Sequence, residues 1–438
     1  MHEIYDNAYV TIVAANAKRC DDRFLQLRRQ LPDHPESLNF DAFSIPYQLR
    51  DGGSDEVLIQ PFQSVRPSSE PITSRAWTLQ ENLLSPRLLI YGSQLLRECR
   101  SESAAVFGLR RFTLTPILGA SNPLQVSRLG FAPRTTPLPA LTELPPTSLD
   151  IFHHVKLLHH YWNEVVQDYS ERKLTNKSDK LLAISGIARR LNLTIFKDYS
   201  YKAGMWLPYS QNKSSFLSDL CWTTNAPLAS RQSSYLAPSW SWASSHVQSS
   251  SGVRIEDVVS WTVPSNSCQL CEVVDCAIDA ERDDPFFRVL GGSLAVRGPL
   301  KKARVLSTGG DKSFFDIVIS GIEMLVPSEY ERLQSFPAAF PLENVDVSSC
   351  SRTRSTLVCD ISFNARFDAI VPELLRDPDS ISIWCLRLTQ KAGLLLQPAD
   401  DRVFRRVGTF WLKELDYRDE ERIDFCFDKL SVTQVTII

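Results

Sequence analysis

The residues best suited to chemistry lie in one short segment, Ser74–Pro86, which combines a tryptophan, an amide and a carboxylate. At about 100° per residue, Gln80 falls in the middle of an apolar helical arc. Glu81 falls at the edge of that arc, one turn after Trp77. A carboxylate fixed beside a buried face can stabilise a developing positive charge. This placement suggests a generic site on the helix.

A helix over residues 75–84 must position these side chains. Thr73 or Ser74 can cap its start, because a hydroxyl can accept a hydrogen bond from an otherwise unpaired backbone N–H. Pro86 ends the helix, since proline disfavours helical geometry in the residue before it. The apolar arc consists of Ala76, Trp77, Leu79, Leu83 and Leu84, and the opposite side carries Arg75, Thr78 and Asn82.

The sequence of residues 1–112 predicts part of an α/β unit that contains this helix. The β-branched run Tyr9–Ala15 is typical of a buried parallel strand. Residues 87–91 and 94–99 predict two strands joined at Gly92-Ser93. Residues 113–149 are rich in proline without a sustained period, which predicts a linker or a long surface loop.

Residues 150–234 predict a helical region, because apolar residues recur at spacings of four and three. The first stripe is Ile151, Val155, Leu158, Trp162, Val165 and Tyr169. The second, after Ser178-Asp179, is Leu181, Leu182, Ile184, Ile187, Ala188 and Leu191. Residues 235–438 hold short β-rich runs such as 293–298, 314–319 and 382–388, which predict a sandwich or a barrel. The fold class expected for the chain is α+β with several domains.

The composition is that of an ordinary globular protein, with 438 residues, 43% apolar and 23% charged. The net charge of −3 argues against a nucleic-acid binder, which would need a basic face. No apolar run approaches the roughly 18 residues of a membrane span. A cytoplasmic location with reduced cysteines is the expectation.

Several other motifs have simpler structural interpretations. Cys268, Cys271 and Cys276 begin with zinc-like spacing, but a structural zinc site needs four ligands, so buried or surface thiols are favoured. His153-His154 and His159-His160 are expected on a solvated helix face, because their spacings do not stack two imidazoles. Residues 307–313 resemble a phosphate loop only superficially and predict a hairpin turn. Trp240 and Trp242 alternate as on a strand and predict core packing.

The segment Arg75-x-Trp77-Thr78-x-Gln80-Glu81 resembles the last core motif of the fungal heterokaryon-incompatibility (HET) domain. Ala76 replaces the usual glycine of that motif. Residues 1–15 are similar to the middle motif of the family. Residues 168–175 and 179–186 resemble the helical region that follows the HET domain in many members. The segments Tyr201–Trp206, Leu220–Trp222, Ala237–Ser244, Gly393–Leu396 and Phe404–Gly408 continue the resemblance in order.

The resemblance implies a fold similar to the Toll/interleukin-1 receptor (TIR) domain, some members of which cleave NAD with a glutamate. That glutamate lies in a Trp-Cys-x-x-Glu motif, and Glu81 stands at the same distance from Trp77. The resemblance therefore implies Glu81 as the candidate catalytic residue. It implies Trp77 and Gln80 as candidate substrate-binding residues. Loss of nicotinamide leaves a positive charge on the ribose, which a carboxylate can stabilise. In the alternative interpretation Glu81 is a local cap or ion-pairs with Arg75 or Arg87, and Trp77 is a core residue.

The first strand of the HET motif set is missing before Met1, so the chain is expected to be truncated at its N-terminus. In TIR-like folds the loop after that strand forms the other wall of the pocket. We therefore expect this truncated form to be inactive or incomplete, with little or no cleavage of NAD, its possible substrate, and with no cofactor or metal. A parallel sheet without its leading strands would expose an edge and an apolar face.

The resemblance implies a role in heterokaryon incompatibility, in which non-self recognition after cell fusion triggers programmed cell death. The HET part would be the effector, through self-association or through NAD depletion with Glu81 at its centre. The alternative is a non-catalytic interaction module, in which the helical and β-rich regions bind a protein partner.

Overall fold

The computed structural model divides into two compact units, Met1–Leu138 (unit 1) and Pro139–Ile438 (unit 2). The residues it describes are 2–22, 24, 43–48, 53–59, 70–92, 95–99, 103–105, 108–111, 159, 162–194, 196–224, 235–245, 253–254, 270–306, 315–325, 345–352, 356–368, 382–389, 392–411 and 432–438. Unit 2 contains both the predicted helical region and the predicted β-rich region. The predicted linker, residues 113–149, lies outside the described residues.

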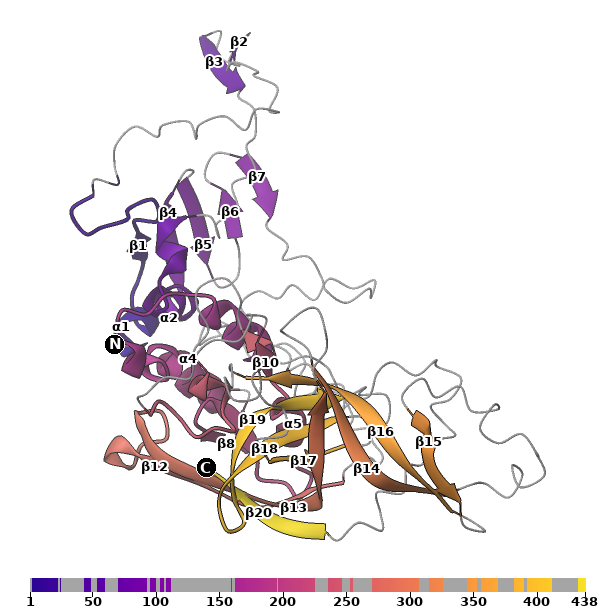
Figure 1. Cartoon of the computed structure of the whole chain (residues 1–438). Coiled ribbons are helices and arrows are strands. Elements are labelled where there is room, and N and C mark those ends of the chain that lie inside the picture. The colour runs from indigo at the N-terminus through magenta and orange to yellow at the C-terminus, as the bar shows by residue number, and fades with distance from the viewer. Residues whose placement is uncertain are drawn as a thin grey trace, which may run out of the picture. The chain divides into compact units, whose positions relative to one another are not determined.

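Unit 1 is built on a five-stranded sheet with the order β1-β4-β5-β6-β7 (Figure 1). Its elements are α1 (His2–Asp6), β1 (Thr11–Val13), β2 (Phe43–Gln48), β3 (Ser54–Ile59), η2 (Pro71–Ser74), α2 (Trp77–Leu84), β4 (Arg87–Tyr91), β5 (Leu95–Cys99), β6 (Ser103–Ala105) and β7 (Gly108–Arg111). β2 and β3 form a separate antiparallel pair. Strands β4 and β5 form the hairpin expected around Gly92-Ser93.

The parallel strand predicted over Tyr9–Ala15 exists but is shorter than expected. β1 pairs in parallel with β4, with Thr11 opposite Leu88. Val13 and Leu88 are buried and form a small core with Ala15. In contrast, Tyr9 is 80% exposed and Ile12 is 59% exposed. The prediction of a buried strand is therefore wrong for one face, because these side chains remain largely exposed among the described residues.

The first part of unit 2 is mainly helical. Residues 162–170 form a helix, followed by η3 (Lys177–Asp179), α4 (Leu182–Thr194) and α5 (Ser214–Asp219). The predicted stripes are confirmed where they are described, with one exception: Leu182 is only partly buried. The buried members are Trp162, Val165, Tyr169, Leu181, Ile184, Ile187, Ala188 and Leu191. A hairpin of β8 (Tyr199–Lys202) and β9 (Met205–Pro208) interrupts the region and was not predicted. β10 (Thr223–Thr224) pairs with β11 (Val253–Arg254).

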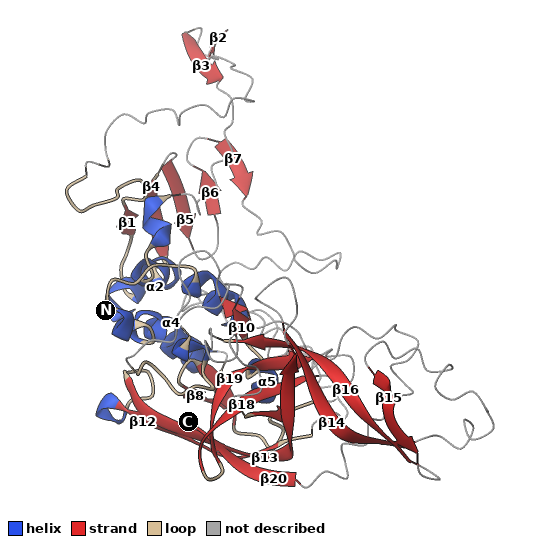
Figure 2. Cartoon of the chain, in the orientation of Figure 1, coloured by secondary structure: helices blue, strands red, loops and turns tan. Residues whose placement is uncertain are grey.

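The second part of unit 2 is a nine-stranded sheet (Figure 2). Its strands are β12 (Glu272–Ala280), β13 (Val289–Leu306), β14 (Phe315–Leu325), β15 (Val345–Arg352), β16 (Thr356–Phe367), β17 (Ile383–Arg387), β18 (Ala392–Asp400), β19 (Val403–Trp411) and β20 (Val432–Ile437). The three example runs named from the sequence overlap β13, β14 and β17 of this sheet. The short helix η6 (Glu281–Asp283) follows β12.

Strand pairings in this sheet close on themselves. β13 pairs with β17, β17 with β18, β18 with β19, β19 with β20, and β20 returns to β13. These five strands therefore form a closed ring of pairings within the sheet. Helices and sheets are both present, so the class is α+β. Among the described residues, none of the helices combines the length and apolar character that crossing a bilayer requires.

Candidate functional site

Helix α2, which carries the residues singled out from the sequence, begins without a side-chain cap. Its N-cap residue is Ala76. The hydroxyls of Thr73 and Ser74 donate to the carbonyls of Glu70 and Pro71, at 2.6 and 2.7 Å. The predicted cap is wrong because η2 immediately precedes α2, and both hydroxyls bond within that turn. The helix ends as predicted, with Ser85 in extended geometry before Pro86.

The buried face of α2 differs from the predicted arc at three positions. Gln80 is buried as expected, at 2% exposure. Thr78, predicted to face outward, is also buried, and its hydroxyl donates to the carbonyls of Ile72 and Arg75. Trp77 and Leu83 are only partly buried. Trp77 is thus not fully buried.

Glu81 is half-buried at the edge of α2, as the helical spacing predicted. Its carboxylate lies near the Tyr5 hydroxyl of α1 and is attracted by the Arg75 guanidinium. Burial raises the pKa of Glu81 above its usual value, while the nearby Tyr5 hydroxyl and the Arg75 charge both act to lower it. Burial, followed by the nearby Glu81 carboxylate, raises the pKa of Tyr5.

The backbone of Glu81 is also held. The Ser85 hydroxyl donates to the Glu81 carbonyl at 2.6 Å, and it shares a 2.8 Å hydrogen bond with the Thr11 hydroxyl of β1. Arg87, proposed as a partner for Glu81, instead donates to the Tyr9 carbonyl and lies over the Tyr9 ring. Arg75 is the arginine that acts on Glu81.

Tyr5, Arg75 and Glu81 are close enough to act on one another's charge. A carboxylate that keeps part of its surface exposed can stabilise positive charge on a ligand or orient its hydroxyls. Trp77 stands one turn before Glu81 on the same helix and offers an aromatic surface. The sequence identified Glu81, Trp77 and Gln80. It did not identify Tyr5, whose only signal is its place in the segment that resembles the family's middle motif.

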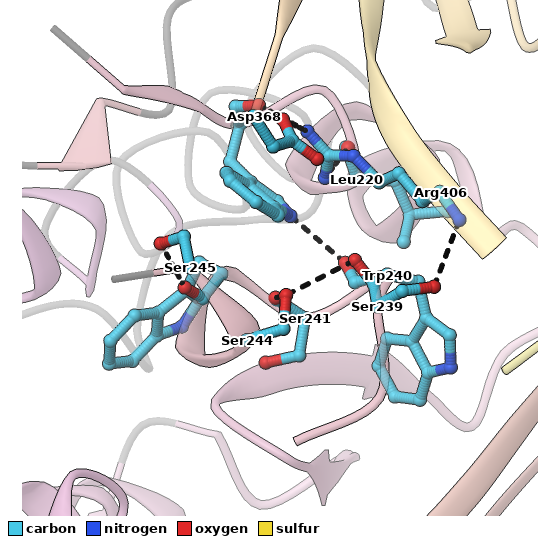
Figure 3. Close-up of polar contacts among 10 residues, drawn as sticks. Leu220, Ser239, Trp240, Ser241, Ser244, Ser245, Asp368 and Arg406 are labelled. Carbon is cyan, nitrogen blue, oxygen red and sulfur yellow. Dashed lines mark hydrogen bonds and ion pairs between the residues drawn. The ribbon is translucent and has the colours of Figure 1, made fainter. Parts of the chain in front are cut away.

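Unit 2 contains a second polar cluster, which is buried (Figure 3). Arg406 on β19 is fully buried and donates to the carbonyls of Leu220 and Trp222 and to the Asp368 carboxylate. Its guanidinium carbon lies 3.5 Å from the centre of the Trp222 ring. The Ser239 hydroxyl accepts from the Arg406 backbone N–H. Each of these partners is part of the fold, so the cluster joins segments that are far apart in the sequence.

Trp240 and Trp242 pack in the core of unit 2, as predicted, and both are fully buried. The strand expected for them is wrong, because they lie in a turn that leads into η4 (Trp242–Ser244). The Ser241 hydroxyl caps η4 through the Ala243 N–H and donates to the Ala203 carbonyl. The motif therefore has a structural role.

The expectation of a solvated histidine face is wrong for His159. Its side chain is 1% exposed and its Nδ1 lies 2.6 Å from the Asp219 carboxylate. His159 stands four residues after Val155 and three before Trp162, so it belongs to the apolar stripe. Phe196 and Tyr199 pack against its ring. His153, His154 and His160 lie outside the described residues.

The remaining sequence motifs give no site in the part of the chain that is described. Cys271 and Cys276 are buried free thiols, and burial raises the pKa of both. The Cys271 thiol donates to the Arg387 carbonyl at 2.8 Å. No cluster of histidine, cysteine and acidic residues suited to a metal ion occurs among the described residues. Cys268 and the turn predicted at 307–313 are not described.

Comparison of the chain with protein-family models, with curated proteins and with solved structures gives no match.

Proposed function

We propose that this protein acts in fungal heterokaryon incompatibility, where non-self recognition after cell fusion leads to programmed cell death. The observation that carries the proposal is the arrangement of Glu81 on α2. The segment that resembles the last HET motif buries Gln80 and keeps Glu81 partly exposed, near Tyr5 and Arg75.

The proposal includes a TIR-like fold for unit 1 and a cytoplasmic location. The parallel pairing of β1 with β4, and the direct passage from α2 into β4, support such a fold. Fusion mixes the cytoplasms of two cells, so a cytoplasmic protein would meet its trigger there.

The experiment is expression of the whole chain under an inducible promoter in a filamentous fungus. We expect cell death on induction, and we expect Glu81→Gln to abolish it, because the amide lacks the charge. Glu3→Gln is the matched control, since Glu3 is exposed on α1. Absence of killing by the unmodified chain at normal protein levels would overturn the proposal.

Two routes lead from Glu81 to cell death, and NAD turnover separates them. Purified protein is incubated with NAD and the release of nicotinamide is followed. Release that disappears with Glu81→Gln supports NAD depletion, with Trp77 as a stacking surface for the substrate. Glu81-dependent killing without nicotinamide release supports self-association.

A second candidate function is a non-catalytic interaction module formed by unit 2. It is supported by the closed ring of strands and by the buried Arg406 cluster, which give this unit a core of its own. In that case killing persists with Glu81→Ala and is lost when unit 2 is disrupted, for example by Gly204→Ala.

A further inference from the structure

We propose that strand β1 is an interaction surface for a second copy of this chain, and that two copies pair β1 against β1 around Ile12. The contact joins the sheets of the two copies across a two-fold axis. The inference names a surface for the self-association route of the proposed function, and it rests on that function for the role of the contact in the cell.

The first observation is the position of β1 in its sheet. β1 stands at the end of the strand order, and β4 is its neighbour among the described strands (Figure 1). A strand carries backbone N–H and C=O groups along both edges, and β4 uses one of these edges. The other edge is a template on which a further strand can form hydrogen bonds.

The second observation is that the side chains at this edge are apolar and exposed. Tyr9, Val10 and Ile12 are 80%, 45% and 59% exposed. Ile12 lies on the face opposite the buried Val13, because successive side chains of a strand alternate. On that face it stands beside Leu89 of β4, which is itself only partly buried. The apolar patch thus continues from the edge strand onto the sheet.

The third observation is that this edge lacks the residues that normally prevent pairing. Natural edge strands are protected by charged side chains or by proline, and residues 9–13 contain neither. Strand β12 of unit 2 provides the contrast, since it pairs only with β13 among the described strands. It carries exposed carboxylates at Glu272, Asp275 and Asp279. The edge of β1 is therefore open to pairing in a way that the edge of β12 is not.

A second copy suits this edge because the segment is complementary to itself. Antiparallel pairing of a strand with its own copy is two-fold symmetric, so the same short segment contributes both sides of the contact. With the axis at Ile12, the two Ile12 side chains face each other and Val10 lies opposite Ala14. Residues 10–14 are uncharged, so the pairing brings no like charges together along the strand.

The exposed area is that of a weak symmetric dimer. From their exposed fractions, Tyr9, Val10 and Ile12 together present roughly 400 Å² per copy. Two copies can therefore bury up to about 800 Å² of these side chains, in addition to the paired backbone, against the roughly 1,000 Å² that a specific interface needs. We expect a reversible dimer with a Kd in the micromolar range.

The test is the association state of the full-length chain, measured by sedimentation velocity over a micromolar concentration range. We expect a dimer that is weakened by about tenfold or more in Ile12→Lys, because two ammonium groups then face each other across the axis. Val274→Lys is the matched control, since Val274 is 42% exposed on the edge strand β12, and it is expected to dimerise like the unmodified chain. Circular dichroism checks that both variants are folded. A monomeric unmodified chain, or equal dimerisation by folded Ile12→Lys, would overturn the inference.

Hydrogen exchange locates the contact without any variant. In the unmodified chain, the protection of the backbone amides of residues 10–14 is expected to increase with protein concentration, whereas that of β12 stays constant. A dimer that forms with no added protection at residues 10–14 would show that another surface is used, and would overturn the inference.

Killing in the induced fungus separates this inference from the proposed function. Loss of killing in Ile12→Lys, with full killing by Val274→Lys, supports the β1 dimer as the active form. Killing by a chain that stays monomeric overturns the dimer alone. A β1 dimer that does not kill supports the contact and overturns the proposed function.

Discussion

The carbonyl oxygen of Gly204 accepts a hydrogen bond of 2.8 Å from the indole nitrogen of Trp242. The same oxygen accepts one of 2.9 Å from Trp162, so one backbone group satisfies two buried tryptophans. Gly204 has a φ of 94° in the turn between β8 and β9. This geometry connects two segments noted separately in the sequence, Tyr201–Trp206 and Ala237–Ser244, and explains why glycine occupies the turn.

Replacement of Gly204 by alanine is expected to destabilise unit 2. A Cβ there would lie 2.7 Å from the Trp242 nitrogen, and positive φ is strained for alanine. Strain alone costs about 1–3 kcal/mol, and displacement of Trp242 adds to it. Urea denaturation followed by tryptophan fluorescence measures the loss. Gly291→Ala is the control, because its Cβ would meet only ordinary contacts. Equal stability of the two variants would contradict this account of the turn.

Arg406→Met is expected to lower the free energy of unfolding of unit 2 by about 3–5 kcal/mol, since it takes the buried cation away from the Asp368 carboxylate and from the carbonyls of Leu220 and Trp222. Asp368 has a side-chain exposure of only 11%. The double variant Arg406→Met/Asp368→Asn should recover part of that loss, because the negative charge that faced Arg406 is then removed as well. Arg405→Met, on the exposed neighbour, serves as the control. If the double variant is less stable than Arg406→Met, the ion pair is not the source of the effect.

The environment of Lys180 makes the free energy of unfolding of unit 2 depend on pH. Its ammonium group donates to the Ser245 carbonyl and lies 5.3 Å from the centre of the Trp242 ring. Burial of that end lowers its pKa to about 7 from an ordinary value of 10.5. Above pH 7 the unfolded chain therefore holds this proton more tightly than the folded chain, so the contribution of Lys180 to stability rises with pH.

The measurable window is from pH 7 to about 8.5, because buried cysteines such as Cys271 and Cys385 have raised pKa values and oppose the trend as unfolded thiols begin to ionise. Within it, Lys180→Met should reduce the rise in the free energy of unfolding. Lys173→Met, at an exposed position, should leave the rise as it is. A steeper rise in the free energy of unfolding with pH in Lys180→Met would contradict the predicted contribution of Lys180.

The local elements of unit 1 were predictable because each has a signal within a few residues. Pro86 marks the end of α2, and the apolar run of residues 87–91 gives β4. The cap was mispredicted because the sequence does not show that η2 uses the Thr73 hydroxyl. Thr78 was misplaced because its burial depends on carbonyls of the preceding turn, which helical spacing alone does not represent.

Contacts between distant segments were the part that the sequence could not supply. Trp240 and Trp242 were recognised as core residues, but their turn depends on Ala203 and Gly204. Arg406 had a signal, since it shares a strand face with Phe404, but its partners at 220, 222 and 368 come from other segments. For the same reason the sequence identified Glu81 but did not show that Tyr5 lies near it.

The most direct test of the central claim is the survival of fungal cells after induction of equal amounts of the unmodified chain, Glu81→Gln and Glu3→Gln. The account predicts that Glu81→Gln restores colony formation to the level of uninduced cells, whereas Glu3→Gln kills like the unmodified chain. Equal killing by all three proteins would contradict it.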